Sequence, residues 1–207
     1  MQRWGVDIVG PLPTAPGNLC FTAVALKYFT KWIKAKALAK ITSGTLISFV
    51  WQRIICHFSV LAYITVDNRK QFDCIEFRNF YSELGIKLAF ASANHPESNV
   101  TVERANGLIF TTISNALFDS AKGKWAQELV TVIWGHNISR TRTTGFTPFL
   151  LLYGEGAIMP EELKLGSFRT KIVATTPMQR YVKLEAAENT RLEATENLDK
   201  YHQETKT

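Results

Sequence analysis

The order of short apolar runs, turn residues and helical patterns is the feature that most constrains the fold of this chain. Strands are predicted over 3–9, 21–28 and 32–38, with Gly10-Pro11 ending the first of them. A helix, a strand, a second helix and a further strand are predicted in turn over 42–58, 62–66, 73–84 and 86–91. Further helices are predicted over 99–118, over 124–139 and from 177 onward. This order predicts an α/β domain with a mixed sheet.

The composition is that of a globular protein. Of 207 residues, 46% are apolar and 12% aromatic, which suits one domain with an appendage. The most apolar stretch, 46–66, contains Gln52, Arg53 and His57, so a helix followed by a strand is predicted there rather than a membrane span. No secretory signal is visible, and three cysteines without a CxxC pair fit a reducing compartment. A soluble intracellular protein is therefore expected.

The net charge of +6 is unevenly distributed along the chain. The tail from 178 to 207 has a net charge of −1, which leaves +7 on the preceding residues. A basic body can attract a polyphosphate partner and release its counterions, but ordinary basic proteins have similar charge. One group of lysines has two possible interpretations, as a strip that faces phosphates or as a solvated strand face. Its members are Lys27, Lys31, Lys34, Lys36 and Lys40.

The tryptophans are predicted mainly as packing residues. Core or helix-packing positions are predicted for four of them: Trp4, Trp51, Trp125 and Trp134. Trp32 follows two lysines, so packing and a DNA contact are both open for it, with packing favoured.

Three acidic residues are candidates for a metal site. Asp7 lies in WGVDIVG and Asp67 in ITVDN, on strands predicted to be neighbours at the centre of the sheet, and Glu103 follows HPESN after 35 intervening residues. Asp67 falls at the carboxyl end of its strand, where open α/β sheets place ligands. Glu103 points about 200° away from Ala105 on the apolar stripe of its helix. Two Mg²⁺ ions about 3.5–4 Å apart would clamp both oxygens of a phosphodiester displacement. An isolated strand-end Asp is more often a turn former, so this spacing alone is a weak signal.

Six sequence blocks occur in a characteristic order. They are WGVDIVGPLP (4–13), YFTKWI (28–33), ITVDN (64–68) with Gln71-Phe72, HPESN (95–99), VERANG (102–107) and TGFTPFLLLYG (144–154). Together they resemble the integrase catalytic core of a gypsy-class LTR retrotransposon of the plant type. The resemblance implies a ribonuclease-H-like fold, a five-stranded mixed sheet of order 3-2-1-4-5 flanked by helices, and a C-terminal helical extension. It implies a catalytic core over 1–170 and a charged helical tail over 171–207.

The resemblance also implies an activity. It implies a polynucleotidyl transferase that performs DNA 3′ processing and strand transfer, with Asp7, Asp67 and Glu103 holding two Mg²⁺ or Mn²⁺ ions. Asn68, His95 and Asn99 would either support the metal ligands or contact DNA. Apart from the resemblance, Lys27 and Lys31 are candidate DNA contacts because of their charge. The implied partners are retroelement ends, target DNA and a second copy in a homodimer. The implied location is the nucleus, with no membrane involved.

Two departures from the family pattern adjoin the acidic residues. The family usually has Gly at the positions of Arg69 and Val100. Arg69 could pair with Asp67 or contact a phosphate, and a lost glycine matters where φ > 0 or close approach is needed. The alternative function is therefore a catalytically decayed nucleic-acid-binding or assembly module derived from a transposon.

Two further interpretations concern related enzymes and the length of the chain. A ribonuclease acting on RNA–DNA hybrids shares the fold, but the HPESN and GFTP blocks favour an integrase. Intact integrases of this class have an N-terminal zinc module and a C-terminal DNA-binding domain. Because Met1 directly precedes the first predicted strand, an excised or degenerated core is expected.

Overall fold

The structure is a computed structural model that describes residues 3–67, 69–90, 125–166 and 177–204. The chain divides into two compact units, Met1–Gly135 and His136–Thr207, which are described separately. The domain boundary expected at 170 rests on the family resemblance and remains a prediction.

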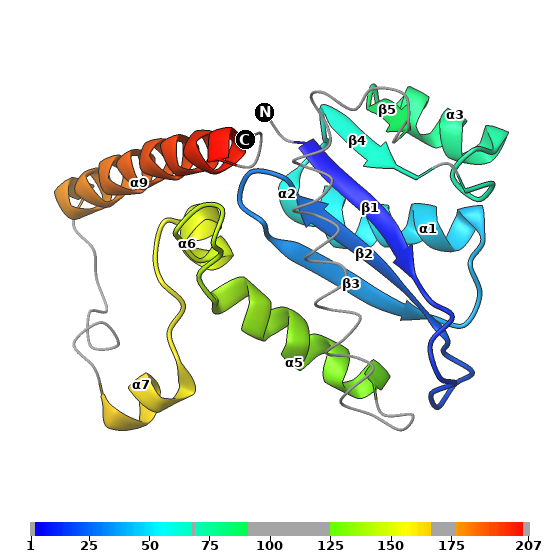
Figure 1. The fold of residues 1–207 in the computed structure, drawn as a ribbon, viewed down its shortest axis with the longest axis horizontal. Coiled ribbons are helices and arrows are strands. Elements are labelled where there is room, and N and C mark those ends of the chain that lie inside the picture. Colours follow the sequence, from blue (N-terminus) through cyan, green and yellow to red (C-terminus); the bar gives the residue numbers. More distant parts are fainter. Residues whose placement is uncertain (1–2, 68, 91–124, 167–176, 205–207) are drawn as a thin grey trace. The chain divides into compact units, whose positions relative to one another are not determined.

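A five-stranded mixed sheet forms the centre of the first unit (Figure 1). Its strands are β1 (Arg3–Val9), β2 (Phe21–Lys27), β3 (Ile33–Leu38), β4 (Tyr63–Val66) and β5 (Lys87–Phe90). Their order is β3-β2-β1-β4-β5, with β1, β2 and β3 antiparallel and β4 and β5 parallel to β1. The predicted order is confirmed, and each predicted strand is found within one or two residues of its predicted ends.

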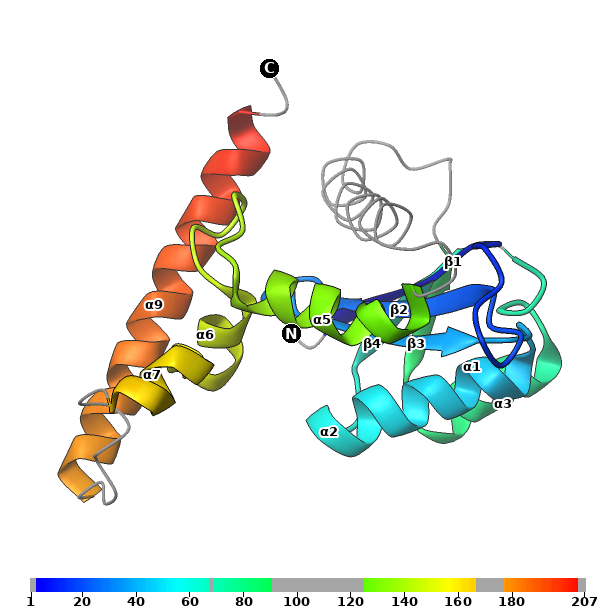
Figure 2. The same cartoon turned by 90° about the horizontal axis from the view of Figure 1, so that it is seen from below.

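The helix predicted over 42–58 is found as three consecutive segments. They are α1 (Ser43–Val50), a π-helical turn, η1 (Trp51–Ile55), and α2 (Cys56–Phe58). Thr42 caps the first turn, because its hydroxyl accepts a hydrogen bond from the Thr45 backbone N–H at 3.2 Å. The helix α3 (Ile75–Glu83) lies with α1 and α2 on one side of the sheet (Figure 2).

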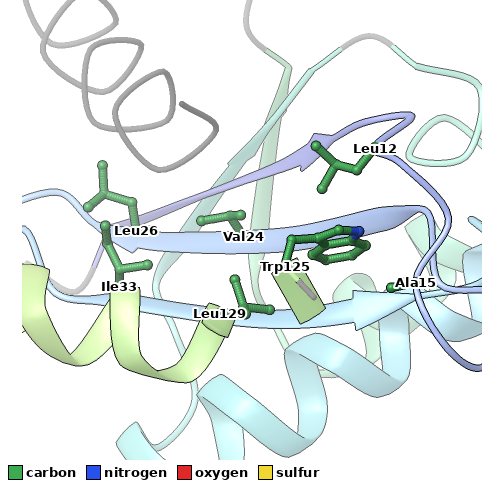
Figure 3. Packing of buried hydrophobic residues seen from close by; sticks show 7 residues of the cluster. All are labelled: Leu12, Ala15, Val24, Leu26, Ile33, Trp125 and Leu129. Carbon is green, nitrogen blue, oxygen red and sulfur yellow. The ribbon is translucent and has the colours of Figure 1, made fainter. Parts of the chain in front are cut away.

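A cluster of buried side chains joins the sheet to α5 (Trp125–Ile138), as Figure 3 shows. The Trp125 indole is 1% exposed, and its Nε1–H donates a hydrogen bond to the Pro13 carbonyl oxygen at 2.6 Å. The members of the cluster are Leu12, Ala15, Val24, Leu26, Ile33, Trp125 and Leu129. Trp125 therefore packs the start of α5 against β2 and β3 and joins it by a hydrogen bond to the loop after β1.

The other tryptophans divide between core and surface. Trp4 and Trp32 are buried, so packing is the outcome for Trp32. Trp51 and Trp134 are 45% and 40% exposed, so the core alternative does not apply to them. Trp51 instead packs its ring edge-on against Phe80 of α3, with ring centroids 6.4 Å apart, which is a helix-packing role.

The second unit contains α6 (Pro148–Tyr153), α7 (Pro160–Leu165) and the long α9 (Pro177–Glu204). The helix expected from 177 onward is present, and its side-chain donors contact α6 and the loop that precedes α6. Arg191 Nε donates a hydrogen bond to the Leu151 carbonyl oxygen at 3.1 Å, and Asn197 Nδ2 donates to that of Thr144 at 3.1 Å. Among the described residues, no helix is long and apolar enough to cross a membrane.

Candidate metal centre

Asp7 and Asp67 lie next to each other because of the register between β1 and β4. These strands are parallel, and Val6 of β1 is paired with Val66 of β4. The next residue on each strand line is an aspartate, so both carboxylates emerge on the same face, at a strand separation of about 4.8 Å. Two side chains distant in sequence thus meet at the carboxyl edge of the sheet.

The Asp7 carboxylate is partly buried within this edge. Its Oδ1 accepts a hydrogen bond from the Ile8 backbone N–H at 2.7 Å. Burial raises the pKa of Asp7 above its ordinary value, and the neighbouring Asp67 carboxylate raises it further. The Ile8 N–H and the Arg69 guanidinium act in the opposite direction. The two carboxylates are therefore close enough to repel each other, which favours a cation between or beside them.

Arg69 supplies a positive charge at this edge. Its Nε lies 2.9 Å from Asp67 Oδ2, its backbone N–H donates to Asp67 Oδ1 at 3.1 Å, and its NH1 group donates to the Ile8 carbonyl oxygen at 3.1 Å. The side chain thus links the ends of β4 and β1. Pairing with Asp67, one of the two alternatives left open by the sequence, is what the structure shows.

The Asp7–Asp67 pair fits a hard divalent cation in its chemistry. Carboxylate oxygens are the ligands that Mg²⁺ and Mn²⁺ prefer. The two groups share one face of the sheet, and the pair already attracts a cationic side chain. Within 3–67, 69–90, 125–166 and 177–204, no group of three His, Cys, Asp or Glu side chains gathers. The third expected ligand, Glu103, lies outside these described residues.

Three further predicted site residues also lie outside the described residues: Asn68, His95 and Asn99. Val100, the second departure from the family pattern, lies outside them as well. These assignments stay predictions.

The two lysines predicted to contact DNA lie at the opposite end of β1 from the carboxylates. Lys27 is paired with Trp4, whereas Asp7 is paired with Val24. Three residues along a strand correspond to about 10 Å. Lys27 is partly buried, with its Nζ 5.6 Å from the centre of the Phe58 ring. Lys31 is only 2% exposed in this conformation. The expected DNA contacts of both lysines stay predictions.

Burial of Lys31 predicts a specific pH dependence of stability. Desolvation lowers the pKa of Lys31 from 10.5 to about 8. Because the folded-state pKa lies below the unfolded one, unfolding takes up a proton between these values, and stability rises with pH. The free energy of unfolding of the wild type, minus that of Lys31→Met, is expected to rise by about 2 kcal/mol from pH 7 to pH 9.5.

Urea unfolding at both pH values checks this expectation. The difference between the two proteins removes the contribution of every other titrating group. Lys40→Met, which changes an exposed lysine, is the matched control and should show no such slope. A flat difference for Lys31→Met would contradict a buried ammonium.

The Ile8 peptide group is a part of the site that sequence reasoning missed. Its N–H binds Asp7 and its carbonyl oxygen binds Arg69. Backbone atoms carry no residue-type signal, so only the position directly after Asp7 could have suggested them.

The fold is similar to that of a known class of protein. A five-stranded sheet of order 3-2-1-4-5 with flanking helices and a C-terminal helix is the ribonuclease-H-like architecture of integrase catalytic cores. The chain is similar in fold to solved retroviral integrases and similar in sequence to foamy virus Pro-Pol polyproteins.

The particular relatives are viral. The catalytic core domain of BIV integrase is similar with a TM-score of 0.52 and 18% identity, over 72% of this chain and 91% of that one. The simian T-cell lymphotropic virus intasome, in complex with PP2A regulatory subunit B56 gamma, matches with a TM-score of 0.58 and 22% identity, over 77% of this chain and 56% of that one.

Sequence comparison identifies Pro-Pol polyproteins of foamy viruses. Simian foamy virus type 1 is 27% identical over 157 residues, 75% of this chain. Feline foamy virus is 29% identical over 164 residues, 77% of this chain. The chain spans about 13% of the length of each polyprotein. No family model matches the chain.

Proposed function

We propose that this chain is the catalytic core of an integrase from a gypsy-class LTR retrotransposon of the plant type. It would act as a polynucleotidyl transferase in DNA 3′ processing and strand transfer. The observation that carries the proposal is the juxtaposition of Asp7 and Asp67 at the carboxyl edge of an integrase-type sheet. The ordered sequence blocks and the viral relatives support it.

In this proposal the acidic residues hold the metal ions. Asp7 and Asp67 are fixed by two neighbouring strands, so their carboxylates need little rearrangement to bind. Glu103 would add the third carboxylate from its predicted helix. Bound Mg²⁺ or Mn²⁺ would supply an activated water and stabilise negative charge on the reacting phosphate. The Ile8 N–H holds one Asp7 oxygen, Oδ1, in place.

The proposed partner is DNA, both retroelement ends and target. The net charge of +7 before residue 178 supports attraction to a polyphosphate. The intasome similarity supports assembly with further copies, of which a homodimer is the simplest. Action in the nucleus follows from the proposed substrate.

Strand transfer by the purified chain tests the proposal. The substrates are a labelled oligonucleotide carrying the terminal repeat of the parent element and a supercoiled plasmid, with Mn²⁺ or EDTA. We expect metal-dependent joining by the wild type and none by Glu103→Gln, because the amide removes a charged ligand. Equal joining by both proteins, or by neither, would count against the proposal.

The ion pair between Arg69 and Asp67 favours a second candidate, a decayed DNA-binding or assembly module. A charge already neutralised by a side chain is a weaker metal ligand. DNA binding that weakens steeply with salt, without metal-dependent joining, would support this candidate. Turnover that requires metal would remove it.

A further inference from the structure

We propose that Arg69 is a built-in cation that competes with the divalent metal for the Asp7–Asp67 pair. The inference rests on the proposed metal site. In this state the guanidinium neutralises Asp67, and a metal ion binds fully only when the Arg69 side chain turns away. Arg69 then sets the metal affinity of the site while contributing no metal ligand.

The contacts of Arg69 place its charge where a metal ion would be needed. Its Nε and backbone N–H together engage both oxygens of Asp67, at 2.9 and 3.1 Å. Its NH1 group reaches across to the Ile8 carbonyl oxygen, directly after Asp7 in β1. The guanidinium is also near enough to Asp7 to lower the pKa of that carboxyl. One side chain therefore acts on both carboxylates of the pair.

The same contacts are weak enough to be reversed. The Arg69 side chain is 44% exposed and the Asp67 side chain 31% exposed. Exposed ion pairs contribute little because water screens them and both side chains lose rotamer freedom. The Arg69 side chain is thus a modest competitor for Asp67, and a divalent ion with twice its charge can displace it.

Removing Arg69 is expected to tighten metal binding. We expect Arg69→Ala to lower the Kd for Mn²⁺ by about tenfold, or ~1.4 kcal/mol, because a competing donor and a like charge both disappear. Arg69→Gln, which keeps most of the side-chain length, should match it. Arg69→Lys keeps a charge but loses the planar fork, so it should fall between Arg69→Ala and wild type.

Isothermal titration of the full chain with MnCl₂, without DNA, measures this directly. Arg78 offers a matched control, because its Nε donates to Asp73 Oδ1 at 2.9 Å in another exposed ion pair. Arg78→Ala removes the same charge from the same unit and should leave the Kd unchanged. Asp67→Asn should abolish the binding in every background. Circular dichroism confirms that each variant is folded, and Arg69→Gln replaces Arg69→Ala if the latter is not.

The outcomes separate this inference from the proposed function. The wild type and both neutral Arg69 variants could bind Mn²⁺ with equal affinity while Asp67→Asn still loses binding. That result would contradict competition by Arg69 but would leave the proposed metal site in place. If Arg78→Ala raised the Mn²⁺ affinity as much as Arg69→Ala, competition by Arg69 would also be contradicted, because the effect would then come from net charge. If neither the wild type nor either neutral Arg69 variant bound Mn²⁺, both the competition by Arg69 and the proposed metal-dependent function would be contradicted.

Discussion

Asp67→Asn is expected to lower the rate of metal-dependent strand transfer by on the order of a thousandfold, about 4 kcal/mol of transition-state stabilisation. The amide has nearly the shape of the carboxylate but lacks its charge, so the metal loses a ligand while the sheet edge is preserved. The Arg69 guanidinium loses its partner at the same time. Rates of plasmid joining under single-turnover conditions give the effect without interference from product release.

Two comparisons make the Asp67 result specific. Asp73→Asn removes another carboxylate paired with an arginine, and its rate should stay close to that of the wild type. Asp67→Asn should also be measured in the Arg69→Ala background, where the Arg69 side chain no longer competes with the metal ion for Asp67. Joining that persists in Asp67→Asn with Arg69 absent would show that Asp67 holds no metal.

Much of the fold could be predicted because local signals agree with the tertiary structure. The strand β2 is buried from Thr22 to Leu26, and its apolar run over 23–26 falls within this buried stretch. Thr42 precedes a helix and caps it through its hydroxyl. The π-helical turn at Trp51–Ile55 has no comparable signal, because its residues suit an α-helix equally well.

The candidate site could be predicted in position but less well in its contacts. Neighbouring parallel strands bring Asp7 beside Asp67, and strand order was open to prediction from the resemblance. The Arg69 contact with Ile8 depends on a backbone carbonyl, which no residue pattern marks. Lys31 is buried in a turn with φ of 60°, and a left-handed conformation at a lysine follows from surrounding packing rather than from its own preference.

Trp125→Ala is expected to destabilise the first unit by about 3–5 kcal/mol. The substitution empties a position that is 1% exposed between α5 and the sheet, and it leaves the Pro13 carbonyl oxygen without the indole donor. Domains are typically stable by only about 5–15 kcal/mol, so a large share of the folding free energy is removed. Urea unfolding followed by far-UV circular dichroism measures the loss as a shift of the transition midpoint.

Trp125→Phe separates the two contributions of the indole. Phenylalanine retains an aromatic ring against Leu12 and Val24 but cannot donate to Pro13, so a smaller loss of about 1–3 kcal/mol is expected. Trp51→Ala, at a position 45% exposed, should cost no more than about 1 kcal/mol. If the Trp125 and Trp51 alanine variants unfolded at the same urea concentration, the packing of α5 against β2 and β3 could not be what holds this unit together. An intact unit is in turn required for Asp7 and Asp67 to meet, because the register of β1 against β4 alone places them side by side.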